Sequence, residues 1–165
     1  MISKTFMVTK KTILIFNIVM AAFFVFAIVV NIYQKNTSAI ILMFIYTLLF
    51  IINILITINI IKIAKNESIK HNILDDIFQE NLIDYKKLKQ KLWYSFILNF
   101  VLFLISIIMT SSVIFVMKSN KSYIELESVN IIINTTIILF TLISISALIN
   151  FIVDIKAIRK INREN

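Results

Sequence analysis

The chain alternates between long apolar stretches and short polar segments. Four apolar stretches are 21 to 25 residues long, and none of them contains Asp, Glu, Lys, Arg or His. At a helical rise of about 1.5 Å per residue, each can cross a hydrocarbon core of about 30 Å. A helix satisfies its backbone hydrogen bonds within one segment, as lipid requires. The pattern therefore predicts four transmembrane helices, over residues 13–33, 39–61, 93–117 and 129–153.

The connections predict two antiparallel hairpins in a single membrane domain over residues 1–165. The first connection, residues 34–38, is a five-residue turn, and residues 118–128 form a short polar loop. Over residues 68–92, apolar residues recur every three or four positions, which predicts an amphipathic helix outside the membrane. The expected fold class is an all-α membrane protein with four transmembrane helices, one cytoplasmic amphipathic helix and a basic tail at 154–165.

Composition narrows the class of protein further. The chain is 59% hydrophobic and its mean hydropathy is +0.92, which excludes a soluble globular domain or a disordered chain. It has no Gly, which excludes Gly-rich phosphate loops and dinucleotide-binding turns. It has no Cys and one His, so a thiolate nucleophile and a multi-His metal site are also excluded. We therefore expect no enzymatic activity, no cofactor and no metal.

Basic residues are distributed unevenly among the polar segments. The N-terminal segment, residues 62–92 and the tail together hold 14 Lys and Arg, whereas the other two connections hold only Lys35, Lys118 and Lys121. Short segments rich in Lys and Arg remain in the cytoplasm. This predicts a protein of the cytoplasmic (plasma) membrane with both termini in the cytoplasm. The abundance of Ile, Asn and Lys, with Lys outnumbering Arg 15 to 2, indicates an A/T-rich, bacterial genome.

Polar side chains inside the predicted spans recur at helical spacing and thus share faces of their helices. A polar group that faces lipid costs free energy, so these faces should pack against other helices and form hydrogen bonds. Alternatively, they line a route for an ion or solute. The candidates for interhelical polar contacts are Asn53, Thr57, Asn99, Ser106, Thr110, Ser146 and Asn150.

Two further candidate sites lie at the predicted membrane surface. Asp154 ends the fourth span, and no basic residue lies three or four positions away on its own helix. Its ion-pair partner must therefore come from another segment; Lys62 is the candidate, with Lys10 or Lys11 at a similar depth. The other site is a docking face on the predicted amphipathic helix, formed by Ile73, Ile77 and Phe78.

These features predict a non-enzymatic accessory or interaction subunit with a cytoplasmic docking helix. Its partners would be the lipid bilayer and another membrane protein, a cytosolic protein or a second copy of the chain. No basic surface with interleaved aromatic residues indicates nucleic-acid binding. One alternative is a small transporter or pore component lined by the intramembrane Asn, Ser and Thr. A second alternative is a holin, a toxin or an immunity-type membrane protein.

Overall fold

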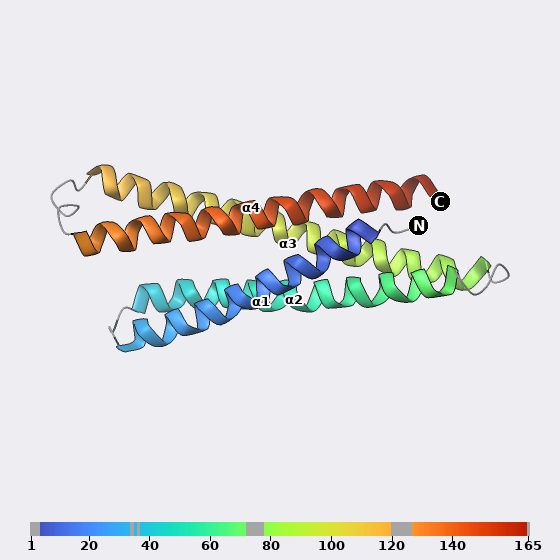
Figure 1. Ribbon diagram of the computed structural model, residues 1–165, viewed down its shortest axis with the longest axis horizontal. Helices are drawn as coiled ribbons and strands as arrows, with labels where there is room; N and C mark the ends of the chain where they lie inside the picture. The colour runs from blue at the N-terminus through green and yellow to red at the C-terminus, as the bar shows by residue number, and fades with distance from the viewer. Residues whose placement is uncertain (1–3, 34, 36, 72–77, 120–126, 165) are drawn as a thin grey trace. The chain divides into compact units, whose positions relative to one another are not determined.

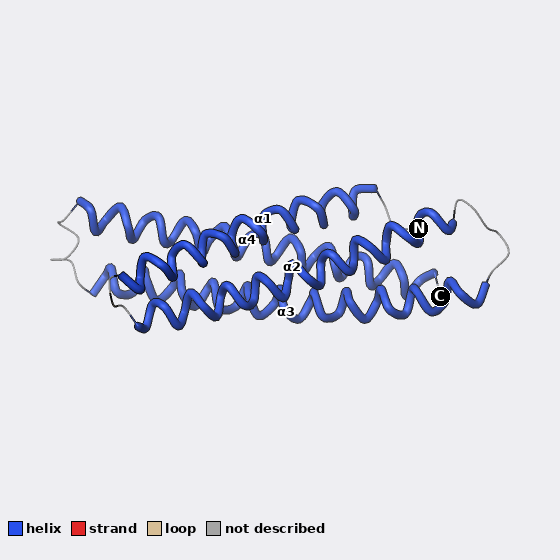
Figure 2. Tube along the Cα trace, turned by 90° about the horizontal axis from the view of Figure 1, so that it is seen from below, coloured by secondary structure: helices blue, strands red, loops and turns tan. Residues whose placement is uncertain are grey.

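The described part of the chain, in a computed structural model, is helical except for the turn residue Lys35 (Figure 1). A second view shows the same helices and no strand among the described residues (Figure 2). The structure describes every residue except 1–3, 34, 36, 72–77, 120–126 and 165. The helices are, in chain order, α1 (Lys4–Tyr33), α2 (Thr37–His71), α3 (Phe78–Ser119) and α4 (Glu127–Glu164).

All four of these helices are long and apolar enough to cross a membrane. The apolar portions are 28 to 31 residues long, so they extend beyond the 21 to 25 residues of the predicted spans. The described residues confirm the predicted all-helical architecture with four long apolar helices, which is compatible with a multi-pass membrane protein. The apolar portions run over Thr5–Tyr33, Ala39–Asn66, Lys86–Phe115 and Ile133–Arg163.

The distribution of exposed side chains fits a lipid environment. Large apolar side chains point outward along every described helix; Ile15, Phe44 and Ile108 are each more than 60% exposed. In water this surface would be unfavourable by roughly 25 cal/mol per Å². Lipid tails are as apolar as leucine, so the same surface is compatible with a bilayer.

Buried positions recur in steps of three and four residues along the helices. This spacing places one narrow stripe of each helix against its neighbours, as in helices that pack in the manner of a left-handed coiled coil. Both apolar and polar side chains occupy the stripes. On α1 the stripe consists of Phe6, Lys10, Ile13, Asn17, Met20 and Phe24, and on α2 of Tyr46, Phe50, Asn53, Thr57, Ile60 and Ala64.

The chain divides into two compact units. The first unit comprises residues 1–98 and 153–165, so it contains α1, α2, the start of α3 and the end of α4. Within it, α1 and α2 lie side by side as an antiparallel hairpin (Figure 1). An apolar cluster joins all four helices in this unit. Its buried members are Phe6, Ile60, Ala64, Leu88, Leu92, Ile158 and Ile161.

The second unit comprises residues 99–152 and pairs the remainder of α3 with the remainder of α4. Phe100 of α3 stacks on Phe151 of α4, with ring centroids 5.8 Å apart. Leu102 on α3 and Phe140 and Ile143 on α4 are buried. The second unit is thus a two-helix element with its own apolar contacts.

The described residues do not show the amphipathic helix predicted over residues 68–92 as a separate element. Residues 68–71 form the last turn of α2, and residues 78–92 are the first part of α3, which continues without a break into its apolar portion. The reason is helix propagation, which adds one hydrogen bond for each residue fixed, in a chain with no Gly or Pro to end a helix. Of the predicted docking face, Ile73, Ile77 and the side chain of Phe78 lie outside the described residues.

The turn between α1 and α2 places a residue with a side chain in the left-handed region. Lys35 has a φ of 55°, and its backbone N–H donates to the carbonyl oxygen of Ile32 at 3.1 Å. This conformation costs roughly 1–2 kcal/mol for a residue with a Cβ atom. Gly adopts it without that steric cost, but the chain contains none.

We therefore expect Lys35→Gly to raise the free energy of unfolding by about 0.5–1 kcal/mol, after the greater freedom of Gly in the unfolded chain is taken into account. Lys35→Ala is the matched control, because it removes the same charge and keeps the Cβ atom. Unfolding of both variants in mixed detergent micelles provides the measurement. Equal stability of the Gly and Ala variants would show that the turn is not strained.

Candidate functional site

A buried ion pair joins α1 to α4 within the first unit. The Nζ atom of Lys10 donates a hydrogen bond to Oδ1 of Asp154. Both side chains are 0% exposed. Ion pairs removed from water are stable only when their geometry is good and other hydrogen bonds satisfy the remaining polar atoms. The stability of this pair therefore depends on the hydrogen bonds that the surrounding residues supply.

Ser95 of α3 supplies the additional hydrogen bond. Its Oγ donates to Oδ2 of Asp154 at 2.6 Å, and it accepts a long hydrogen bond from Lys10 Nζ at 3.5 Å. Ser95 is itself 0% exposed. Both carboxylate oxygens of Asp154 are thus hydrogen-bonded, and three helices meet at one carboxylate. We call Lys10, Ser95 and Asp154 the buried polar centre.

The helical spacing explains why these three side chains meet. Lys10 lies four residues after Phe6, Ser95 three after Leu92, and Asp154 four before Ile158. Each member of the centre therefore lies one helical turn from a member of the apolar cluster and on the same stripe. The Phe6 ring also lies 5.9 Å from Lys10 Nζ, at a cation–π distance.

The apolar cluster lies on one side of the buried polar centre, toward the start of α1 and the end of α4. It separates the ion pair from that end of the first unit. Exclusion of water strengthens the attraction between the two charges, and it also increases the cost of leaving either one unpaired. The centre is consequently sensitive to a change in charge on either partner.

The predicted pairing of Asp154 with Lys62 is wrong, because the Lys62 side chain is exposed and Asp154 pairs with Lys10, the alternative candidate at a similar depth. Lys62 lies between the buried positions Ile60 and Ala64 of α2, so it points away from the stripe. The apolar pattern places Lys10 in the polar segment before the first predicted span, at residues 13–33. Extending the three- and four-residue spacing of α1 back from Ile13 would have placed it on the stripe.

Most predicted interhelical polar residues are buried. Asn53 and Thr57 belong to the first unit, and the others belong to the second. Thr110 and Ser146 are only half-buried, and the Thr110 hydroxyl donates to the backbone carbonyl of Ser106 on its own helix at 2.9 Å. The buried members of the set are Asn53, Thr57, Asn99, Ser106 and Asn150.

Three buried polar residues were missed as candidates, Asn17, Thr47 and Ser95. Asn17 lies seven residues after Lys10 on α1, two turns farther along the same stripe. Its Nδ2 atom and the Thr57 Oγ1 atom of α2 are buried and have no hydrogen-bond partner among the described residues. Polar atoms thus continue along the stripes of the first unit beyond the ion pair.

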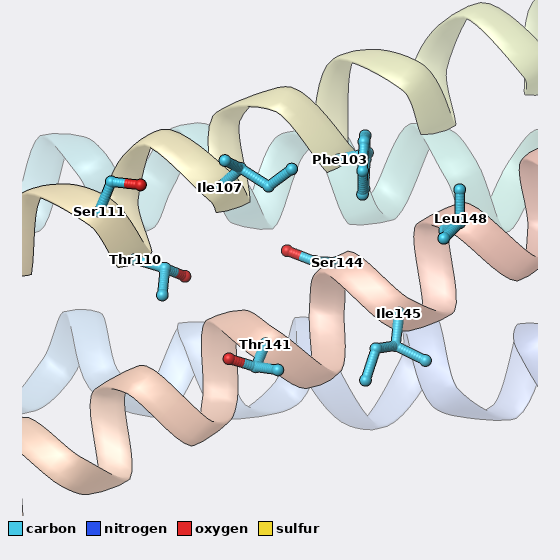
Figure 3. Close-up of a pocket in the computed structure, with 8 residues that line it drawn as sticks. All are labelled: Phe103, Ile107, Thr110, Ser111, Thr141, Ser144, Ile145 and Leu148. Carbon is cyan, nitrogen blue, oxygen red and sulfur yellow. The ribbon is translucent and has the colours of Figure 1, made fainter. Parts of the chain in front are cut away.

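The second unit contains a pocket between α3 and α4 (Figure 3). Thr110 and Ser144 point into the space between the two helices, but their hydroxyls donate to backbone carbonyls of their own helices, each at 2.9 Å. Much of the remaining wall is apolar, with Phe103, Ile107 and Leu148 among its residues. This pocket suits an apolar group rather than a charged ligand.

No group of three or more His, Cys, Asp or Glu side chains that could hold a metal ion occurs in the part of the chain that the structure describes. Comparisons of the chain with protein-family models, curated proteins and solved structures found no match. The buried polar centre is therefore interpreted from its own chemistry.

Proposed function

We propose that this protein is a non-enzymatic, multi-pass protein of the cytoplasmic membrane that moves protons, either as a small transporter or as a component of a pore. The observation that carries the proposal is the fully buried pair of Lys10 and Asp154, held by Ser95 within apolar helices. Ionisable side chains within membrane helices are costly, and they characteristically mark ion routes and proton relays.

A proton fits the centre better than a metal cation does. Hard cations need several oxygen ligands, whereas the centre offers one carboxylate and one hydroxyl, and the ammonium group of Lys10 already occupies the carboxylate. Protonation of Asp154 neutralises its charge and removes the attraction for Lys10. Loss of the proton restores the ion pair. The centre can thus alternate between two arrangements that differ by one proton.

The polar atoms beyond the ion pair support this proposal. Asn17 Nδ2 and Thr57 Oγ1 lie in the same unit as the centre and are buried, with no hydrogen bond to a described residue. Buried polar atoms of this kind are normally satisfied by ordered water or a ligand. Water at these positions would give a proton a hydrogen-bonded route to or from Asp154.

The same structure weakens the support for an accessory subunit with a docking helix. That hypothesis depended on a separate amphipathic helix over residues 68–92, and residues 78–92 are instead continuous with the apolar portion of α3. The burial of Asn53 and Asn99 fits both structural contacts between helices and a polar route, whereas the buried ion pair of Lys10 and Asp154 favours transport. We therefore place transport first.

The test is proton flux into liposomes that contain the purified full chain and a pH-sensitive dye. An imposed pH gradient should decay faster with the protein than without it. The double variant Lys10→Met with Asp154→Leu removes both charges together, so neither is left buried and unpaired. It should fold and lose the flux by about tenfold or more. Lys62→Met is the matched control, because it removes an exposed lysine of the same unit, and its flux should be unchanged.

Three outcomes would contradict the proposal. The unaltered protein could fail to accelerate the decay of the gradient. The folded double variant could retain full flux, which would make the ion pair a packing device only. Leakage of a large dye such as carboxyfluorescein along with protons would instead indicate a lytic protein of the holin or toxin type.

The orientation that we propose, with both termini and residues 62–92 in the cytoplasm, has its own test. The chain has no Cys, so single cysteines can be introduced one at a time. In intact cells, a membrane-impermeant thiol reagent should label Lys121→Cys and should leave Lys87→Cys unlabelled until the membrane is opened. Both positions lie in Lys-containing polar segments, so reactivity in opened cells provides the control. The reverse pattern would invert the topology.

A further inference from the structure

A basic stripe lies on the last turns of α4. Lys156, Arg159, Lys160 and Arg163 line one surface hollow, and all four side chains are exposed. They occupy positions i, i+3, i+4 and i+7, so they share one face of the helix.

Orientation in the membrane does not explain why two of these four residues are arginine. The chain contains 15 lysines and only two arginines, and both arginines line this hollow, one helical turn apart. Orientation in the membrane depends on positive charge, which lysine supplies equally well. The guanidinium group differs from an ammonium group in presenting a planar fork of N–H donors that binds phosphate through two hydrogen bonds. Arginine at both positions therefore points to a phosphate group.

The hollow has a fixed support on the opposite face of α4. Ile158 and Ile161 are buried in the apolar cluster of the first unit, and Val153 and Ala157 pack against it. The arginines thus project from a helix that is held by the core. Fixed donors bind an ion at a lower entropic cost than donors on a mobile tail.

We propose that the hollow formed by Lys156, Arg159, Lys160 and Arg163 binds the phosphate headgroup of an anionic phospholipid. We favour a lipid as the source of the phosphate group because of where the hollow lies along α4. The apolar portion of this helix runs to Arg163, so the hollow lies where a membrane helix reaches the headgroup layer. Clusters of basic residues next to a membrane helix attract anionic lipids in this layer. This inference does not depend on proton transport.

The test compares retention of phosphatidylglycerol and phosphatidylcholine by the purified full chain, measured by native mass spectrometry from detergent micelles. The double variant Arg159→Lys with Arg163→Lys keeps every charge and removes both planar forks. It should retain about fivefold less phosphatidylglycerol than the unaltered protein, with little change for phosphatidylcholine. Because both positions are exposed, folding should be unaffected, and a thermal unfolding curve checks this.

The control is Lys86→Gln with Lys87→Gln, which removes two charges from exposed positions of α3 in the same unit. A specific phosphate site predicts that this control retains more phosphatidylglycerol than the arginine variant, although it has lost more charge. The opposite order would show general attraction to basic residues and would overturn the proposal. A second result would also overturn the proposal. If inorganic phosphate bound to the protein in lipid-free micelles and the double arginine variant bound it equally less well, the site would bind a soluble anion rather than a lipid.

Discussion

Replacement of Asp154 by leucine should lower the free energy of unfolding by about 3–5 kcal/mol. The substitution leaves Lys10 buried without the carboxylate that neutralises its charge; the hydrogen bond to Ser95 is long, at 3.5 Å, and the Phe6 ring lies 5.9 Å away. The apolar cluster on one side of the centre hinders the entry of water that would relieve this charge. The effect is thus the cost of an uncompensated buried charge, added to the loss of a contact.

A double-mutant cycle separates those two terms. Lys10→Met alone should be destabilising, since it leaves the Asp154 carboxylate buried without the charge of Lys10, although Ser95 still donates a hydrogen bond to it. The combination of Lys10→Met with Asp154→Leu should recover most of the lost stability, because well-packed apolar residues can replace a buried ion pair at little cost. Unfolding in mixed detergent micelles provides all four values. Additive effects of the two single variants would mean that the two charges do not interact.

Phe24→Ala should lower the free energy of unfolding by a similar amount, about 3–5 kcal/mol. Phe24 is 0% exposed and joins α1 to α2 through two aromatic contacts. Its ring stacks on Tyr46 at a centroid distance of 5.1 Å and on Phe50 at 5.8 Å. Because Phe24 is fully buried between the two helices, truncation leaves a cavity and the lost packing is not replaced.

Phe26→Ala is the control for this prediction. Phe26 lies two residues farther along the same helix and is 66% exposed, so its ring faces away from the helix contacts. Its removal should change the free energy of unfolding by less than about 1 kcal/mol, because lipid fills the space it leaves. Equal effects of the two substitutions, measured in the same detergent mixture, would show that the aromatic stack does not hold the hairpin together.

The membrane-spanning architecture was predictable because it depends on properties that each segment carries by itself. An apolar stretch of more than 20 residues without charge specifies a membrane helix, and the short connection at residues 34–38 specifies an antiparallel hairpin. The inward position of Asn53 and Asn99 follows from the cost of facing polar groups to lipid. These expectations need no knowledge of neighbouring helices.

The ion pair could not be predicted in the same way, because it depends on which faces of separate helices meet. Lys62 and Lys10 lie at comparable depth, and only the buried stripe of each helix distinguishes them. Ser95 gives no signal by itself, since a serine in a membrane helix usually bonds to its own backbone, as Ser144 does. The continuity of residues 78–92 with the apolar portion of α3 was also missed, because no Gly or Pro marks where α2 ends or where α3 begins.

The ion pair also determines when the folded protein can be completed during synthesis. Lys10 and Asp154 are separated by 144 positions, so α1 enters the membrane long before its charged partner exists. Until α4 is made, burial of Lys10 would leave an uncompensated charge in an apolar environment. The start of α1 should therefore remain near water during translation and move inward last, when α4 arrives. Closure of the first unit is then a late step in folding, because it requires α4 to be inserted in the position that brings Asp154 to Lys10.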